Sequence, residues 1–284
     1  MGAAGVRQLM IGLPATGKTT FLAALWHVLR SDEVPGALEL ADVLGDREYL
    51  NRIADQWSAC DELERTPTRG EPVVIRVRHP ATGETTELWI PDMSGETFEA
   101  QWEAREATAE FASQAEEAAG AILFLHPDVT RETDFIADAN LALAGWADAG
   151  AAPAAGEPAP PAEPWQARNV PTQVKVVELL QFLREHQPAG WRLAVVVSAW
   201  DRAGGGASAE AWVSERAPLL AQYLRANDHH FEVRYYGVSA QGGDIRTGAD
   251  GLLGVTTPAE RITVVGPDAA PHDITAPVKW LMGV

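Results

Sequence analysis

The sequence predicts an α/β fold with three layers, in which a mainly parallel sheet of six strands carries helices on both faces. Apolar runs of strand length alternate with segments whose apolar residues recur at helical spacing. Two of the runs, 120–125 and 193–197, are almost continuously apolar, which is typical of central strands covered on both faces. Because few hairpin turns separate the strands, most neighbouring strands are expected to pair in parallel.

The first half of the chain begins with a strand at 6–11 and a helix at 19–30, whose apolar residues fall on one face. Residues 73–78 and 85–90 are strand-like, and the turn residues between them predict a hairpin. The acidic, alanine-rich stretch 96–119 is expected to be one helix that leads into the strand 120–125.

The second half continues the alternation. A helix is expected at 174–186, followed by the strand 193–197, a helix over 208–226 with Ser208 as its N-cap, and a sixth strand at 231–239. A strand-like segment, 261–265, and a short helix at 274–282 follow.

The composition fits one domain spanning 1–284. A chain of 284 residues with 46% hydrophobic content can bury a full core, and its length leaves room for insertions. One insertion, 31–70, has apolar residues at helical spacing and is expected to be partly helical. Another, 145–170, is rich in Ala and Pro; a flexible linker is expected there, with a partner-binding tether as the alternative.

The charge and the single cysteine restrict the partners and the compartment. A net charge of −18 and a pI near 4.7 oppose contact with nucleic acid or anionic membrane, so neither is expected as a partner. Cys60 is the only cysteine, which excludes an internal disulfide and suits a reducing compartment. No apolar run approaches the length of a membrane helix, and a signal peptide has no room, so a cytoplasmic location is expected.

The strongest motif lies between the first strand and the first helix. Residues 12–19 match the phosphate-binding pattern G-x-x-x-x-G-K-[ST], and Lys18 is one of only three lysines in the chain. Loop amides and the positive end of the helix would cradle phosphates, Lys18 would reach the β and γ phosphates, and the Thr19 hydroxyl would bind Mg²⁺. The predicted architecture is therefore a P-loop NTPase fold. The nucleotide-binding candidates in this loop are Gly12, Leu13, Pro14, Ala15, Thr16, Gly17, Lys18, Thr19 and Thr20.

A second element, D-x-x-G, follows the strand 85–90. Asp92 would hold a water molecule of the Mg²⁺ shell, and Gly95 would turn its N–H toward a γ-phosphate. By itself the pattern also fits a turn that caps a helix. Its position after a strand that follows the phosphate loop favours the nucleotide interpretation.

Two further elements stand at strand ends, Ser198-Ala-Trp-Asp201 and Ser239-Ala240. With the loop and Asp92, they make the chain resemble a Ras-like or Arf-like GTPase of the translation-factor-related (TRAFAC) P-loop class. The resemblance implies GTP/GDP and Mg²⁺ as cofactors. It also implies that Asp201 accepts two hydrogen bonds from guanine and that Ser239 and Ala240 complete the base site.

The resemblance has departures at the base-recognition element. Ser198 and Ala199 stand where the class has Asn or Thr and then Lys, so the lysine stem that packs on the base is missing. The choice between GTP and ATP therefore stays open. Trp200 would either stack on the base or belong to the core.

The switch threonine is expected in 64–70, and the similarity to the P-T-x-G of Arf-like proteins favours Thr68 over Thr66 as the second Mg²⁺ ligand. Arg65 precedes Thr68 by three residues, the offset of the internal arginine finger in heterotrimeric G-protein α subunits. Arg65 is therefore a catalytic candidate, with an exposed arginine in a polar loop as the alternative.

The catalytic candidates also include Lys18 and Glu96. Glu96 stands where most of the class has the glutamine that positions water. A carboxylate orients water but adds negative charge beside the phosphate, so slow or partner-stimulated hydrolysis is expected.

Three functions fit these residues. A GTPase switch is the first, and a catalytically weak subunit that uses bound triphosphate to stabilise an assembly is the second. A small-molecule kinase would need basic residues in a lid over the phosphates, and residues 145–164 contain none.

Segments 170–181 and 274–281 are similar to bacterial double-GTPase proteins. Those proteins are thought to act in pairs beside phage-conflict and defence genes. The similarity implies a guanine nucleotide and a second GTPase-like or effector protein as partners.

Overall fold

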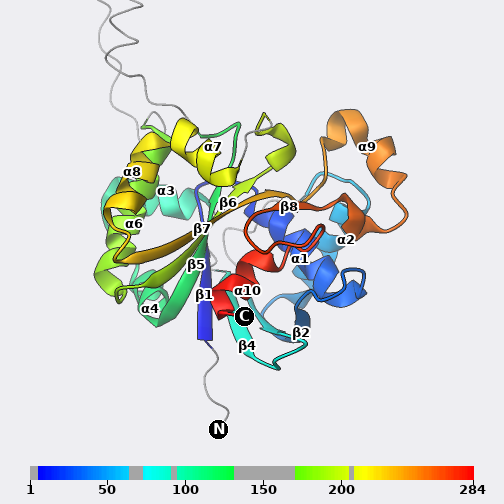
Figure 1. Cartoon of the computed structure of the whole chain (residues 1–284), viewed down its shortest axis with the longest axis horizontal. Coiled ribbons are helices and arrows are strands. Elements are labelled where there is room, and N and C mark those ends of the chain that lie inside the picture. Colours follow the sequence, from blue (N-terminus) through cyan, green and yellow to red (C-terminus); the bar gives the residue numbers. More distant parts are fainter. Residues whose placement is uncertain (1–5, 64–72, 91–94, 131–169, 205–207) are drawn as a thin grey trace, which may run out of the picture.

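The computed structural model describes residues 6–63, 73–90, 95–130, 170–204 and 208–284, and of residues 95–97 it describes the backbone alone. These residues form one eight-stranded sheet in the order β2-β3-β4-β1-β5-β6-β7-β8 (Figure 1). The pairs β4–β1, β1–β5, β5–β6 and β6–β7 are parallel. The predicted α/β fold with a mainly parallel sheet is confirmed, but the predicted count of six strands is wrong.

The strand bounds show which part of the sheet was predicted. The parallel strands are β4 (Thr85–Ile90), β1 (Val6–Ile11), β5 (Ala118–Leu125), β6 (Trp191–Ser198) and β7 (Phe231–Ser239). β3 (Val73–Arg78) pairs antiparallel with β4, which confirms the hairpin. The edge strands β2 (Glu39–Leu44) and β8 (Thr263–Val265) are also antiparallel to their neighbours.

The two edge strands account for the difference from six. β2 lies in the insertion that was expected to be partly helical, and Ala41, Asp42 and Leu44 are exposed on it. β8 has three residues and occupies part of the strand-like segment 261–265, which was not counted as a strand. Edge strands pair on one side only and bury little, so their sequences lack a clear apolar period.

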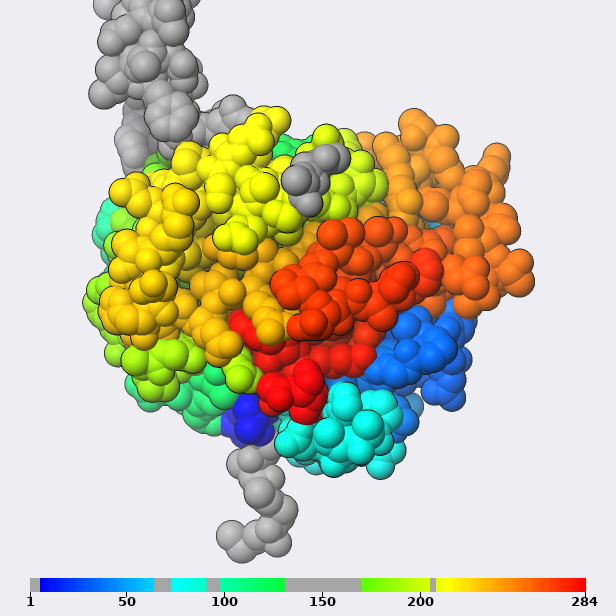
Figure 2. All heavy atoms as spheres, viewed as in Figure 1, coloured from blue at the N-terminus to red at the C-terminus, as the bar shows by residue number. Residues whose placement is uncertain are grey.

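Helices cover both faces of the sheet, as Figure 1 shows. On one face lie α1 (Lys18–Ser31), α2 (Arg47–Ser58) and α10 (Ala276–Met282). On the other face lie α3 (Gly95–Ala104), α4 (Ala109–Glu117), α6 (Thr172–His186), α7 (Ala209–Arg216) and α8 (Pro218–Ala226). α9 (Ile245–Leu253) has no buried residue, and it forms a corner of the surface, coloured orange in Figure 2.

Successive side chains of the central strands enter two different cores. On β5, Ile122 and Phe124 pack with α1 and α2, whereas Ala121, Leu123 and Leu125 pack with the helices of the opposite face. Because both faces of β5 and β6 are covered, residues 120–125 and 193–197 are all apolar. The continuous apolar runs of the sequence are thereby explained.

Two predicted helices are each broken into two. Arg105 has a left-handed backbone (φ 53°) just after α3, and the Thr108 side chain accepts a hydrogen bond from the N–H of Phe111 to start α4. Pro218 has no N–H and cannot continue α7, so it begins α8. Ser208 caps α7 as predicted, accepting a hydrogen bond from the N–H of Ala211 at 3.1 Å.

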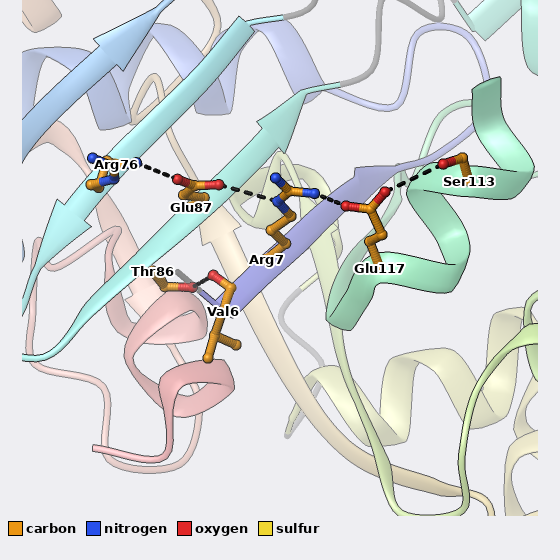
Figure 3. A network of polar contacts seen from close by, with 7 residues as sticks. All are labelled: Val6, Arg7, Arg76, Thr86, Glu87, Ser113 and Glu117. Atoms are coloured by element: carbon orange, nitrogen blue, oxygen red, sulfur yellow. Dashed lines mark hydrogen bonds and ion pairs between the residues drawn. The ribbon is translucent and has the colours of Figure 1, made fainter. Parts of the chain in front are cut away.

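A polar network joins β3, β4, β1 and α4 (Figure 3). Arg76 Nη2 donates to Glu87 Oε1 at 2.6 Å and Arg7 Nε donates to Glu87 Oε2 at 3.2 Å. Arg7 also pairs with Glu117, which accepts a hydrogen bond from Ser113. Burial by itself raises the pKa of Glu87, but the hydrogen bonds from Arg76 and Arg7 outweigh burial and lower it. These contacts link β3, β4 and β1 and fix the register of the three strands. They lie at the start of β1, the end remote from the phosphate loop.

None of the described helices is long and apolar enough to cross a membrane.

Candidate nucleotide-binding site

The glycines of the phosphate loop (12–17) lie where other residues would collide. Gly17 has φ 82°, a left-handed backbone, and a Cβ placed on it would lie 2.8 Å from Ser198 Oγ. A Cβ on Gly12 would lie 2.9 Å from Thr16 Oγ1 and 3.1 Å from the carbonyl oxygen of Phe124. The loop therefore packs closely against the ends of β5 and β6.

Lys18 curls back over the phosphate loop. Its Nζ donates to the carbonyl oxygens of Gly12 at 2.6 Å and Leu13 at 2.7 Å. Burial lowers the pKa of Lys18 to about 8, and no carboxylate among the described residues pairs with it. A partly buried ammonium group with neutral partners would be stabilised by an anion in the loop, since an opposite charge offsets the cost of losing water.

The start of α1 also suits an anion. Its N-cap residue, Gly17, makes no side-chain capping bond, and its first turn contains no acidic residue. The first N–H groups of a helix have no partner within the helix, and they carry its positive end. Thr19 and Thr20 lie in this turn and are half-buried. The loop and α1 together form a cradle of the kind that binds phosphate.

Thr19 is the residue of this cradle that would hold Mg²⁺. No cluster of three or more carboxylate, imidazole or thiol groups lies in the part of the chain that the structure describes. Mg²⁺ in nucleotide sites is held by few protein ligands together with phosphate oxygens and water, so the hydroxyl of Thr19 beside Lys18 is a suitable donor.

Ser198 ties the phosphate loop to the sheet. Its buried Oγ lies 2.8 Å from the carbonyl oxygen of Thr16 and 3.0 Å from that of Leu125, and it donates toward both. The residue that replaces the Asn or Thr of the resembled class therefore has a structural contact of its own. Ala199 follows with a left-handed backbone (φ 45°) and offers no lysine stem.

Asp201 and Ser239 are brought together from neighbouring strand ends. The buried Ser239 hydroxyl donates a hydrogen bond to Oδ1 of Asp201, and Asp201 itself is exposed. One carboxylate oxygen is thereby oriented by β7. Trp200 packs over Gly237 of β7, where a Cβ would lie 2.3 Å from the indole, and joins the core on that face. This contact favours the core interpretation of Trp200.

His126 belongs to the same edge but was missed from the sequence. Its Nδ1 accepts a hydrogen bond from the N–H of Asp128 at 3.1 Å, and Asp128 pairs with Arg202 at 2.7 Å. Its ring carbon Cδ2 lies 3.9 Å from a Cβ placed on Gly17, and burial lowers the pKa of His126. His126 directly follows the apolar strand β5, and a polar residue at such a strand end is the signal that could have found it.

The described residues bring the phosphate loop, Ser198, Asp201, Ser239 and Ala240 to the carboxyl edge of the parallel strands. This is the edge where ligands of such sheets bind. Arg65, Thr68 and Asp92 lie outside the described residues, as do residues 145–169 of the second insertion. Gly95 and Glu96 begin α3, and the side chain of Glu96 also lies outside the description.

The model of one protein family, described as Double-GTPase 1, matches residues 9–281. No curated protein sequence matches the chain.

Solved structures with a partial likeness include three proteins. A bacterial selenocysteine-specific elongation factor has 12% identity and a TM-score of 0.37 over 88% of this chain and 28% of its own. A Plasmodium falciparum protein described as nucleolar GTP-binding protein 1 has 9% identity and a TM-score of 0.38 over 88% and 84%. A GTP-binding protein from Sulfolobus solfataricus in complex with GDP has 11% identity and a TM-score of 0.31 over 83% and 47%. The chain spans well under half of the elongation factor and just under half of the Sulfolobus protein.

Proposed function

This chain belongs to the Double-GTPase 1 family, and on that premise we propose that it is a Mg²⁺-dependent GTP-binding protein that hydrolyses GTP slowly and acts as a nucleotide switch. The observation that carries the proposal is the half-buried Lys18 ammonium group at the start of α1, where the N-cap residue is a glycine and the first turn has no acidic residue. It has neutral carbonyl partners and no carboxylate among the described residues, so it suits a triphosphate.

In the proposed complex, residues 12–20 hold the phosphates and Lys18 contacts the β and γ phosphates. Thr19, Thr68 and Asp92 hold Mg²⁺, with Asp92 acting through water, and Gly95 turns its N–H to the γ-phosphate. Held by these residues, the metal ion would supply positive charge against the negative charge of the phosphates. We also assign residues 31–70 to the switch-bearing insertion of a single domain.

The base is recognised, in this proposal, by Asp201, Ser239 and Ala240. The Asp201 carboxylate accepts two hydrogen bonds from guanine, which adenine does not donate at the same positions. The hydrogen bond from Ser239 to Asp201 supports this role because it orients the carboxylate at the strand edge. GTP is therefore proposed over ATP.

Hydrolysis is assigned to Glu96 and Arg65. Glu96 orients the attacking water at the cost of placing a negative charge near the phosphate, which makes turnover slow or dependent on a partner. Arg65 contacts the γ-phosphate from the same chain. Phosphate release from Glu96→Gln and Arg65→Ala proteins tests both roles, and rates equal to that of the parent would remove them.

The partner in this proposal is a second GTPase-like or effector protein in a bacterial multi-protein system of the conflict or defence type. The location is cytoplasmic, without contact to nucleic acid or membrane. The family name and the similarity of segments 170–181 and 274–281 support this part.

A second function is a catalytically weak subunit that uses bound triphosphate to stabilise an assembly. Ser198 favours it, because its hydroxyl is occupied by the carbonyls of Thr16 and Leu125 and Ala199 supplies no lysine for the base. Glu96 in place of glutamine points the same way.

Nucleotide identification followed by single-turnover hydrolysis tests the proposal. The nucleotide that leaves with the purified protein is identified first, and GTP and ATP are then compared with and without EDTA, alongside Lys18→Ala. Mg²⁺-dependent GTP hydrolysis supports the switch, and stable binding without hydrolysis supports the assembly role. A parent that binds neither nucleotide, or binds as Lys18→Ala does, would refute both.

A further inference from the structure

The carboxyl end of α2 forms a tight turn. The N–H of Cys60 donates to the carbonyl of Trp57 at 3.1 Å, and the N–H of Asp61 donates to that of Gln56 at 2.9 Å. Cys60 itself has a left-handed backbone (φ 57°), the conformation that commonly ends a helix. The turn presents Trp57 toward the segment that follows β7.

Trp57 holds residues 239–242, which comprise the last residue of β7 and the three that follow it, by two hydrogen bonds. Its indole Nε1 donates to the carbonyl oxygen of Ala240 at 3.0 Å, and its own carbonyl accepts from Gln241 Nε2 at 3.3 Å. Trp57 is fully buried, so solvent offers no alternative partner for these groups. The bond to the carbonyl of Ala240 fixes the peptide group that follows Ala240.

Arg261, which lies between α9 and β8, holds Trp57 and the turn after α2 in place. Its guanidinium is buried, lies 4.6 Å from the Trp57 ring, and donates to the carbonyls of Trp57 at 3.1 Å and Ser58 at 3.3 Å. It also contacts the Cys60 sulfur at 2.8 Å. The ion pairs of the described residues do not include Arg261, so its contacts there are with neutral groups.

The segment 239–242 rests directly on the backbone of Arg261. A Cβ on Gly242 would lie 2.3 Å from the Arg261 carbonyl oxygen, and Gly242 has φ 85°. α2 and the segment that carries Arg261 lie side by side, because Arg261 donates to the carbonyl of Trp57. The segment is therefore fixed between two parts of the chain that contain none of the nucleotide motifs.

We propose that Trp57 and Arg261 are positioning residues for base recognition. They hold Ser239 and Ala240 in the geometry that the base requires, and Ser239 in turn orients Asp201. The preference for GTP over ATP thus depends on α2 as well as on the motif residues. This inference rests on the proposed function, because it assigns the base site to Asp201, Ser239 and Ala240.

Trp57→Phe tests the proposal, because it removes the indole N–H and keeps an aromatic ring. Trp26→Phe is the matched control: Trp26 is also fully buried, and its Nε1 donates to Asn51 Oδ1 at 3.0 Å without contacting the segment 239–242. Dissociation constants for GTP and ATP are measured for both variants and the parent. We expect the GTP-to-ATP affinity ratio of Trp57→Phe to fall about fivefold, the effect of one hydrogen bond, and that of Trp26→Phe to stay unchanged.

Arg261→Lys supplies a second variant, which keeps a positive charge and loses the planar fork. We expect its GTP-to-ATP affinity ratio to fall about fivefold as well. Thermal unfolding confirms that each variant is folded, and Arg261→Lys provides the test if Trp57→Phe does not fold. If the parent binds GTP through Lys18 but Trp57→Phe and Arg261→Lys have the same GTP-to-ATP affinity ratio as Trp26→Phe, this inference alone is overturned. A parent without preference for GTP overturns it as well, and a parent that binds neither nucleotide overturns the proposed function too.

Discussion

The phosphate loop and the residues that we propose to recognise the base, Asp201, Ser239 and Ala240, are built in different ways. Lys18 makes its hydrogen bonds to residues five and six positions away. At the base end, Asp201 and Ser239 are separated by 38 positions, and Trp57 and Ala240 by 183. The phosphate loop is thus specified by a short stretch of sequence, whereas the base-recognition residues depend on the assembled sheet. Substitutions at the two ends should accordingly have different effects on GTP and ATP.

Lys18→Ala is expected to have the largest effect, and the effect should be equal for the two nucleotides. It removes charged hydrogen bonds to two phosphates, each worth about 1.5–3 kcal/mol, so both affinities should fall by at least about 100-fold. Equilibrium binding of GTP and ATP measures this change, and thermal unfolding checks the fold. A loss confined to GTP would contradict a phosphate role for Lys18.

Asp201→Asn should separate the two ends most clearly. The change removes the charge that accepts the hydrogen bonds of guanine and should lower GTP affinity on the order of 10- to 100-fold, with ATP affinity nearly unchanged. The control is Asp228→Asn at an exposed aspartate away from the site. Parallel losses for GTP and ATP would show that Asp201 does not read the base.

Ser198→Ala tests the point where the two ends meet. Its hydroxyl supports the carbonyls of Thr16 and Leu125, so its loss should disturb the phosphate loop and weaken GTP and ATP alike, by about 3- to 10-fold. Titration with both nucleotides checks the expectation. If GTP alone were weakened, Ser198 would belong to base recognition.

Ser239→Ala should have the smallest effect. It leaves the Asp201 carboxylate in place but removes the hydrogen bond that orients it, and GTP affinity should fall about 2- to 5-fold while ATP affinity is retained. Ser113→Ala is the matched control, because it removes a hydrogen bond from serine to Glu117 that lies away from the site. Equal GTP affinities for the two variants would argue against an orienting role for Ser239.

The same contrast explains what the sequence could predict. The phosphate loop, the parallel strands and the cap at Ser208 follow from local patterns, and the structure has the strands and the cap where they were predicted. β2 was missed because its burial comes from pairing with β3 and leaves little periodicity. The break at Arg105 has no proline or glycine to announce it.

In the candidate site, too, residues in short motifs were recognisable from the sequence, and residues that act through distant contacts were not. Asp201 and Ser239 were recognisable from their places in motifs. Trp57 and Arg261 belong to no motif, and their importance comes from contacts across about 200 positions, which no local pattern contains. His126 was recognisable in principle, since it directly follows the strand β5.

The contact between Arg261 and Trp57 also has a consequence for synthesis of the protein. Arg261 meets the carbonyl of Trp57 across 204 positions, so a ribosome working at about 5–20 residues per second makes the second residue on the order of 10–40 s after the first. Until then Trp57 has no guanidinium to pack against. A nascent chain released before residue 261 would carry every nucleotide motif and would lack one of the contacts that we propose to position Ser239 and Ala240.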